Sequence, residues 1–164
     1  NLNTNFINNI GTEWANKIAT TIWKVGGSAY GLIRDVAPRT AYYYEVERPN
    51  AMSTSTTGET EYNAQIGLMY VSDYGFAADP SAWTLTMYNY LNTTAKSTNW
   101  MYMGLDEWTI TRYAEYTDRA FSIKNYGAVL ESDNNAVVRP SFSLLSSTTY
   151  VSGSGSADNP ILIN

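Results

Sequence analysis

Hydrophobic side chains recur every four residues through the first part of the chain. The members of this series are Phe6, Ile10, Trp14, Ile18 and Ile22. A four-residue spacing places such side chains on one face of a helix, so it predicts a single amphipathic helix over residues 3–25. The helix should end at the glycine pair 26–27, because glycine readily adopts the left-handed cap conformation. Its apolar face can pack against the domain's own sheet or contact a partner.

After this helix the apolar positions fall into short segments separated by turn residues, a pattern typical of β-strands. The segments predicted as strands are 42–48, 66–71, 99–103, 107–111, 120–124, 128–130, 137–145 and 160–163. Residues 81–91 fit either a short helix or a strand, and 152–156 should form a surface loop. The sequence therefore predicts one α+β domain over residues 1–164, with a helix at 1–25 and a globular part at 26–164.

The amino-acid composition excludes several kinds of catalytic and metal site. The chain has 15 acidic and 10 basic residues, a net charge of -5, and neither His nor Cys. These absences exclude Ser-His-Asp and Cys-His nucleophile systems and the usual zinc and haem ligands. Without a basic cluster to neutralise phosphates, a nucleic-acid partner is not expected. The lack of Cys favours an exported protein over a cytosolic one.

No run of 18 apolar residues occurs, so no segment of the sequence reads as a transmembrane helix. The sequence opens with Asn1 and an amphipathic helix, as though it continued a more hydrophobic segment. We expect an extracellular domain, attached to a membrane only through such an upstream anchor.

Three groups of carboxylates raise the question of catalysis or metal binding. Glu45 and Glu47 would share one face of the predicted strand, as a glycosidase acid-base pair requires, but a solvated strand face is the favoured interpretation. The loop 131–135 offers oxygen ligands without the spacing of an EF-hand, so an ordinary turn is favoured over a calcium site. Asp73 should cap a turn. We expect no enzyme activity and no cofactor, and the sequence gives no support for a calcium site.

Tyrosine is the most distinctive residue, with 14 copies. Such residues supply large contact areas at binding surfaces, although strands also favour them. The segment 100–126 combines tryptophan, tyrosine, Asp118 and Arg119, and Tyr126 lies in its last turn. The residues predicted to form a ligand-binding face are Trp100, Tyr102, Trp108, Tyr113, Tyr116 and Arg119. If some of these residues belong to the core instead, Trp100 and Trp108 are the best candidates.

The second half of the chain resembles bacterial C-type-lectin-like domains. The resemblance rests on Asn99-Trp100, the run 107–111, Ala120-Phe121 with Gly127 six residues later, Val138-Arg139-Pro140 and Leu144-Leu145. This broad group includes formylglycine-generating-enzyme-like modules and the variable proteins of diversity-generating retroelements. The chain lacks the Glu-Pro-Asn and Trp-Asn-Asp calcium motifs and the active cysteines, so the resemblance implies a fold without those activities.

A closer resemblance links the chain to globular regions of prepilin-type surface proteins from Firmicutes and their relatives. It is carried by Tyr44 with Glu47-Arg48, the run 66–77, Asn99-Trp100, 107–109, Val138-Arg139-Pro140 and the ending 153–161. In that family a hydrophobic N-terminal helix anchors the subunit in the membrane and then in the filament. The resemblance implies that the helix at 3–25 continues such an anchor.

Together these features predict a surface-displayed domain of a type IV pilin-like subunit or adhesin that recognises a protein or glycan ligand. One alternative is a purely structural filament subunit, which would contact neighbouring subunits through the apolar helix face. Another is a retroelement-diversified binding protein on a phage or cell surface.

Overall fold

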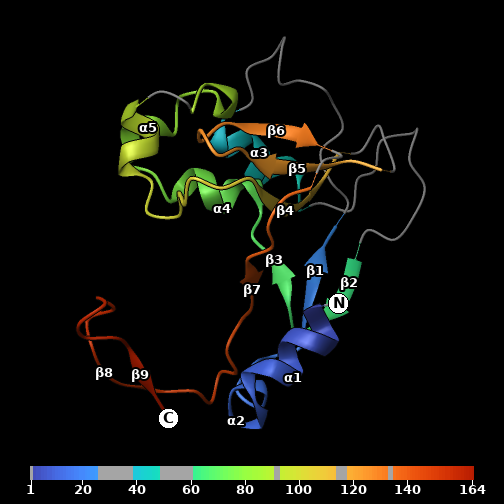
Figure 1. Cartoon of the computed structure of the whole chain (residues 1–164), viewed down its shortest axis with the longest axis vertical. Helices are drawn as coiled ribbons and strands as arrows, with labels where there is room; N and C mark the ends of the chain where they lie inside the picture. The colour runs from blue at the N-terminus through green and yellow to red at the C-terminus, as the bar shows by residue number, and fades with distance from the viewer. Residues whose placement is uncertain (1, 26–38, 49–60, 91–92, 114–117, 133–134) are drawn as a thin grey trace.

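The computed structural model describes residues 2–25, 39–48, 61–90, 93–113, 118–132 and 135–164. Its helices and small antiparallel sheets form an α+β arrangement, as the sequence predicts. Figure 1 shows α3, α4 and α5 around the sheet β4–β5–β6, with α1, α2 and the remaining strands at the opposite end.

The helices are short. They are a π-helical turn at Leu2–Phe6, α1 at Ile7–Ile10, α2 at Thr12–Ala15, α3 at Thr40–Val46, α4 at Val71–Phe76 and α5 at Thr93–Thr98. Two 3-10 turns, at Pro80–Ala82 and Met87–Asn89, occupy the region that fitted either a helix or a strand.

The strands of the described residues form four small antiparallel sheets. β1 (Thr21–Lys24) pairs with β2 (Glu61–Ala64), and β3 (Gly67–Leu68) pairs with β7 (Pro140–Ser141). The largest sheet contains β4 (Glu107–Arg112), β5 (Ala120–Ile123) and β6 (Val129–Ser132) in sequence order. The last pair is β8 (Tyr150–Ser152) with β9 (Leu162–Ile163).

The prediction of one helix over 3–25 is wrong. Gly11, at φ 84°, separates α1 from α2, and helix ends at Ala15. Downstream, the β-branched residues Thr21 and Ile22 belong to β1, because pairing with β2 overrides the four-residue pattern. The apolar series is therefore divided: Ile18 is buried, whereas Trp14 and Ile22 are exposed on different elements.

Two predicted strands are also corrected. Residues 42–48 lie mostly in α3, where Tyr43 points into the core; a run of tyrosines favours a strand locally, but packing against α4 and Phe121 decides the outcome. The apolar run 66–71 forms only the short β3 and then starts α4, whose first turn is closed by the carboxylate of Asp73 accepting the Tyr70 N–H at 2.9 Å. Asp73 thus caps a turn, as predicted.

Of the other predicted strands, some are confirmed and others are absent or shorter in the structure. Strands β4, β5 and β6 confirm the three segments from 107 to 130, and a turn with Gly127 at φ 96° joins the last two. Residues 99–103 form no strand. The segment 137–145 retains only β7, and 160–163 contains β9.

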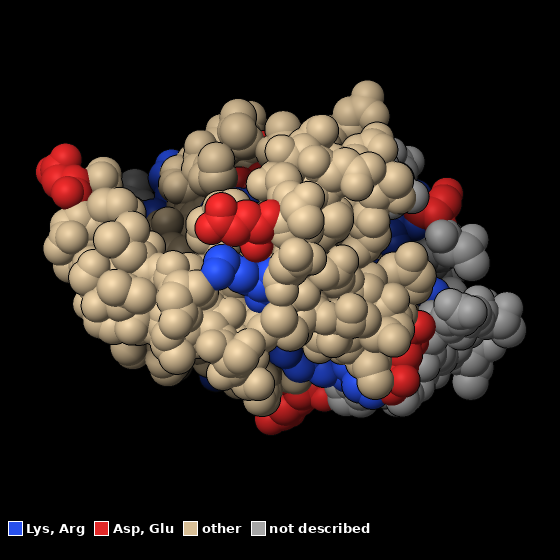
Figure 2. All heavy atoms as spheres, turned by 90° about the horizontal axis from the view of Figure 1, so that it is seen from below, with Lys and Arg blue, Asp and Glu red and all other residues tan. Residues whose placement is uncertain are grey.

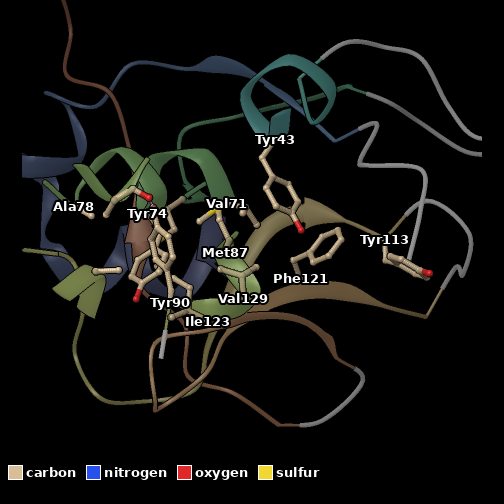
Figure 3. Close-up of a cluster of buried hydrophobic side chains, with 13 residues drawn as sticks. Tyr43, Val71, Tyr74, Ala78, Met87, Tyr90, Tyr113, Phe121, Ile123 and Val129 are labelled. Atoms are coloured by element: carbon tan, nitrogen blue, oxygen red, sulfur yellow. Dashed lines mark hydrogen bonds between the residues drawn. The ribbon is translucent and has the colours of Figure 1, made fainter. Parts of the chain in front are cut away.

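The main core lies between α3, α4 and the sheet β4–β5–β6. Figure 3 shows the ring of Tyr43 directed at Phe121, with Tyr113 on the other side of Phe121. The centroid distances to Phe121 are 5.4 Å for Tyr43 and 5.7 Å for Tyr113. Two buried tyrosine hydroxyl groups have partners: that of Tyr74 donates to the carbonyl of Gly127 at 3.0 Å, and that of Tyr90 donates to the carbonyl of Ala82 at 3.1 Å.

The C-terminal segment leaves this body beside the N-terminal helices, where Ala19 N–H donates to the carbonyl of Ser143. Figure 1 shows β8 and β9 at a distance from the other sheets. None of residues 142–164 is buried, and the exposed apolar side chains there include Tyr150, Val151 and Ile161. The predicted loop 152–156 follows β8 and is exposed or half-buried.

Candidate functional site

Strand β4 presents two different faces. Glu107, Thr109 and Thr111 are buried, whereas Trp108, Ile110 and Arg112 are half-buried on the outer face. The pairing of β4 with β5 is irregular between Trp108 and Arg112. Irregularities of this kind redirect neighbouring side chains, and they are common beside functional sites.

A cavity of about 420 Å³ lies on this outer face, and we call it the β4–β5 groove. It is wide open to solvent. Leu68 of β3 and Trp108 supply apolar walls, and Ala120, which lies opposite Arg112 in the sheet, supplies a small one. Such a volume falls in the range of sites that hold small ligands.

The charged groups of the groove are Arg112, Asp118 and Arg119. Two cations and one anion leave a charge of +1 among the described lining residues, although the whole chain carries -5. Guanidinium groups bind carboxylates in a planar, two-pronged geometry and also stack on aromatic rings. The groove can therefore hold a ligand that joins a carboxylate to a flat or apolar portion.

Charge is sparse on the face drawn in Figure 2. That face consists mostly of uncharged residues, with a few small groups of Lys or Arg atoms next to Asp or Glu. The groove contains two of the 10 basic residues of a chain in which 15% of residues are charged.

The structure brings together two of the residues predicted for a binding face, Trp108 and Arg119, in the β4–β5 groove. Trp100 is 80% exposed and lines a separate depression, so the suggestion that it belongs to the core is wrong. The hydroxyl of Tyr102 donates to the carbonyl of Asn125 at 2.6 Å, next to the β5–β6 turn. Tyr116 lies outside the described residues.

Tyr113 does not belong to an exposed face. It is 5% exposed and packs edge-on against Phe121, because odd-numbered residues of β4 and its continuation point into the core. Arg112 was missed by the sequence analysis. The sequence did contain a signal for it: side chains alternate between the two faces of a strand, so residue 112 lies on the same face as Trp108.

Glu45 and Glu47 do not form the pair that a glycosidase would need. Residue 45 lies on α3 and residue 47 directly follows its last residue, so neither is on a strand, and Glu45 is exposed while Glu47 is completely buried. The Glu47 carboxylate accepts hydrogen bonds from the Ser72 N–H at 3.2 Å and the Thr111 hydroxyl at 2.7 Å. Burial raises the pKa of Glu47 to about 7, against the opposing effect of these hydrogen bonds and of Arg48.

Glu107 is the second buried carboxylate. Its Oε2 lies 2.7 Å from a guanidinium nitrogen of Arg139, which also donates to the carbonyl of Met101 at 2.9 Å. Burial raises the pKa of Glu107, and Arg139 opposes the shift. This pair ties the Val138-Arg139-Pro140 segment to the edge of β4.

Within the described ranges, no three Asp or Glu side chains gather in a way that could hold a metal ion. Part of the loop 131–135 lies outside these ranges. Among the same described residues, no helix has the length and apolar character needed to cross a membrane.

Comparisons of the chain with protein-family models, with curated proteins and with solved structures find no match.

Proposed function

We propose that this chain is a non-catalytic recognition domain that binds a carboxylate-bearing ligand in the β4–β5 groove. The observation that carries the proposal is the convergence of Trp108, Arg112 and Arg119 on one open cavity. Tryptophan and arginine dominate the energetics of binding sites, because each combines a large contact area with directional polar groups. The ligand would stack on the indole and pair with the guanidinium groups.

The wider setting belongs to the same proposal. We propose that the domain has a C-type-lectin-like fold and is displayed outside the cell on a type IV pilin-like subunit or an adhesin. The three-stranded sheet and the closing segment around Arg139 support the fold assignment, since both occur where the resemblance expects them. The short helices α1 and α2 give little support to a continuous filament helix.

Binding of acidic and neutral glycans and of acidic peptides to the immobilised domain tests this function. Arg119→Ala and Trp108→Ala should each weaken binding of an acidic ligand at least about tenfold, and Arg119→Lys should weaken it less. Lys17→Ala removes a positive charge far from the groove in the sequence and serves as the control. Equal binding by wild type and Arg119→Ala would refute the assignment.

A structural filament subunit is the second candidate, favoured by the exposed C-terminal segment. Tyr150, Val151 and Ile161 expose apolar surface in a part of the chain that contains no buried residue. Association of copies would cover this surface. Sedimentation of the purified chain over a range of concentrations tests it: an unchanging monomer counts against self-assembly.

A further inference from the structure

A second surface of the molecule concentrates exposed aromatic rings. Its members come from four separate parts of the chain, and we call them the aromatic surface: Tyr44, Phe76, Trp83 and Trp100. Phe76 is the centre, with ring centroids 5.9 Å from Tyr44 and 5.0 Å from Trp83, both edge-on. Clustered exposed rings of this kind mark interaction sites more often than scattered ones do.

Trp100 and Phe76 of the aromatic surface line the same depression. The residues that line this depression of about 380 Å³ include Phe76 and Ala77 from one part of the chain and Trp100 and Met101 from another. The backbone N–H of Trp100 donates to the carbonyl of Ala77 at 3.3 Å, which ties the two walls together. The indole of Trp100 itself is 80% exposed, so a ligand in the depression can lie against it.

The surface is preformed. The indole N–H of Trp83 donates to the carbonyl of Ala78 at 3.0 Å. Next to Trp100, the side-chain amide of Asn99 donates to the carbonyl of Tyr74 at 2.7 Å and accepts the Met101 N–H at 2.9 Å. A ligand therefore binds without ordering these segments, which lowers the entropic cost of association.

Polar groups at the depression indicate what kind of ligand fits. Asp73 and Ser141 line it beside the aromatic walls. The Asp73 carboxylate already accepts from Arg48 at 2.8 Å and from the Tyr70 N–H, and each oxygen retains capacity for a further donor. Hydroxyl groups of a ligand can use that capacity, whereas a purely apolar partner would leave it unused.

Charge argues for a neutral ligand. Two of the described cations lie near the depression. Arg48 is engaged with Asp73 and lies 5.3 Å from the ring of Tyr44. Arg139 donates to the carbonyl of Met101, which lines the depression, and is engaged with Glu107. Asp79 adds a negative charge close to Trp83 in sequence and accepts hydrogen bonds from Ser81. Both cations are already paired with a carboxylate, so an acidic ligand would have to compete with Asp73 or Glu107 for a guanidinium group.

We infer that the aromatic surface is a binding site for a neutral glycan, with Trp100 and Phe76 as the stacking walls. A pyranose ring presents C–H groups on one face, which pack against the negative face of an aromatic ring, and hydroxyl groups at its edge. The hydroxyl groups meet Asp73 and Ser141 while the ring lies against Trp100. This site is separate from the β4–β5 groove and does not depend on its proposed function.

Calorimetric titration with neutral oligosaccharides derived from cellulose, chitin and mannan, at millimolar concentration, tests the inference. One of these sugars should bind, and Trp100→Ala should lower its association constant at least about tenfold. Trp100 is exposed, so the variant should keep the wild-type thermal unfolding temperature. Trp14→Ala, a change of an exposed tryptophan in α2, should leave binding unchanged.

Any of the following results would overturn the inference: the absence of saturable binding across the panel, equal binding by wild type and Trp100→Ala, or preferential binding of an acidic sugar or a quaternary ammonium ion at Trp100. Loss of neutral-sugar binding in Trp108→Ala with retention in Trp100→Ala would place the sugar in the β4–β5 groove and also count against it. Failure of Arg119→Ala to affect acidic ligands bears only on the groove.

Discussion

The hydroxyl of Thr111 on β4 donates a hydrogen bond of 2.7 Å to the carboxylate of Glu47 at the C-terminal end of α3, across 64 positions of sequence. The same hydroxyl oxygen accepts the Val71 N–H at 3.0 Å, and the carboxylate accepts the Ser72 N–H. Two completely buried polar side chains thus join α3, the start of α4 and the central sheet. The free energy of folding therefore depends on the protonation state of Glu47.

Glu47→Gln should remove a pH dependence from the stability of the domain. The pKa of Glu47 is about 7 in the folded state against an ordinary value of 4.5. Below pH 4.5 both states hold the proton; between 4.5 and 7 the unfolded state loses it first, so the free energy of unfolding falls as pH rises. The total loss is ~3 kcal/mol. Glutamine stays neutral, so the variant should lack this fall.

Urea unfolding of wild type and variant across this pH range measures the effect. The difference between the two free energies isolates Glu47, because Glu107, whose pKa is also raised, is present in both. Glu45→Gln makes the same change at an exposed position two residues earlier in the chain and controls for the loss of one negative charge. Parallel curves for wild type and Glu47→Gln would contradict the prediction.

Gly67→Ala should destabilise the domain by about 2 kcal/mol. Gly67 is buried, and a Cβ there would lie 2.5 Å from ring carbons of Trp23. The cost should shrink in a Trp23→Leu background, where the ring is gone, and a double-mutant cycle measures this coupling. Additive effects of the two changes would show that the close approach does not limit the size of residue 67.

Arg139→Ala should destabilise the domain by about 3 kcal/mol or more, because it leaves the carboxylate of Glu107 buried without its ion-pair partner. Removal of the cation also removes the effect that opposes the raised pKa of Glu107, so the loss should be larger at high pH than at low pH. Chemical denaturation at two pH values checks both statements.

Arg48→Ala serves as the comparison for Arg139→Ala. Arg48 pairs with Asp73, whose side chain is 43% exposed, and an exposed pair of this kind contributes about 1 kcal/mol or less. A loss for Arg48→Ala as large as that for Arg139→Ala would mean that burial does not distinguish the two ion pairs.

The sequence predicts part of the candidate site. Trp108 and Arg119 were chosen for their residue type within an aromatic segment, and both line the β4–β5 groove. Tyr113 was chosen for the same reason, yet it packs on Phe121. Residue type alone does not reveal which face of a strand a side chain occupies; alternation from a known neighbour does.

The sequence by itself determined the α+β class and the three strands from 107 to 132, because alternation and a glycine turn specify a local hairpin. Tertiary structure alone decided that residues 21–24 pair as β1 and that Tyr43 lies in a helix. Both segments have local patterns compatible with another state, and contacts with residues distant in sequence selected the observed one. The same long-range contacts buried Glu47 and gathered Phe76 and Trp100 around one depression.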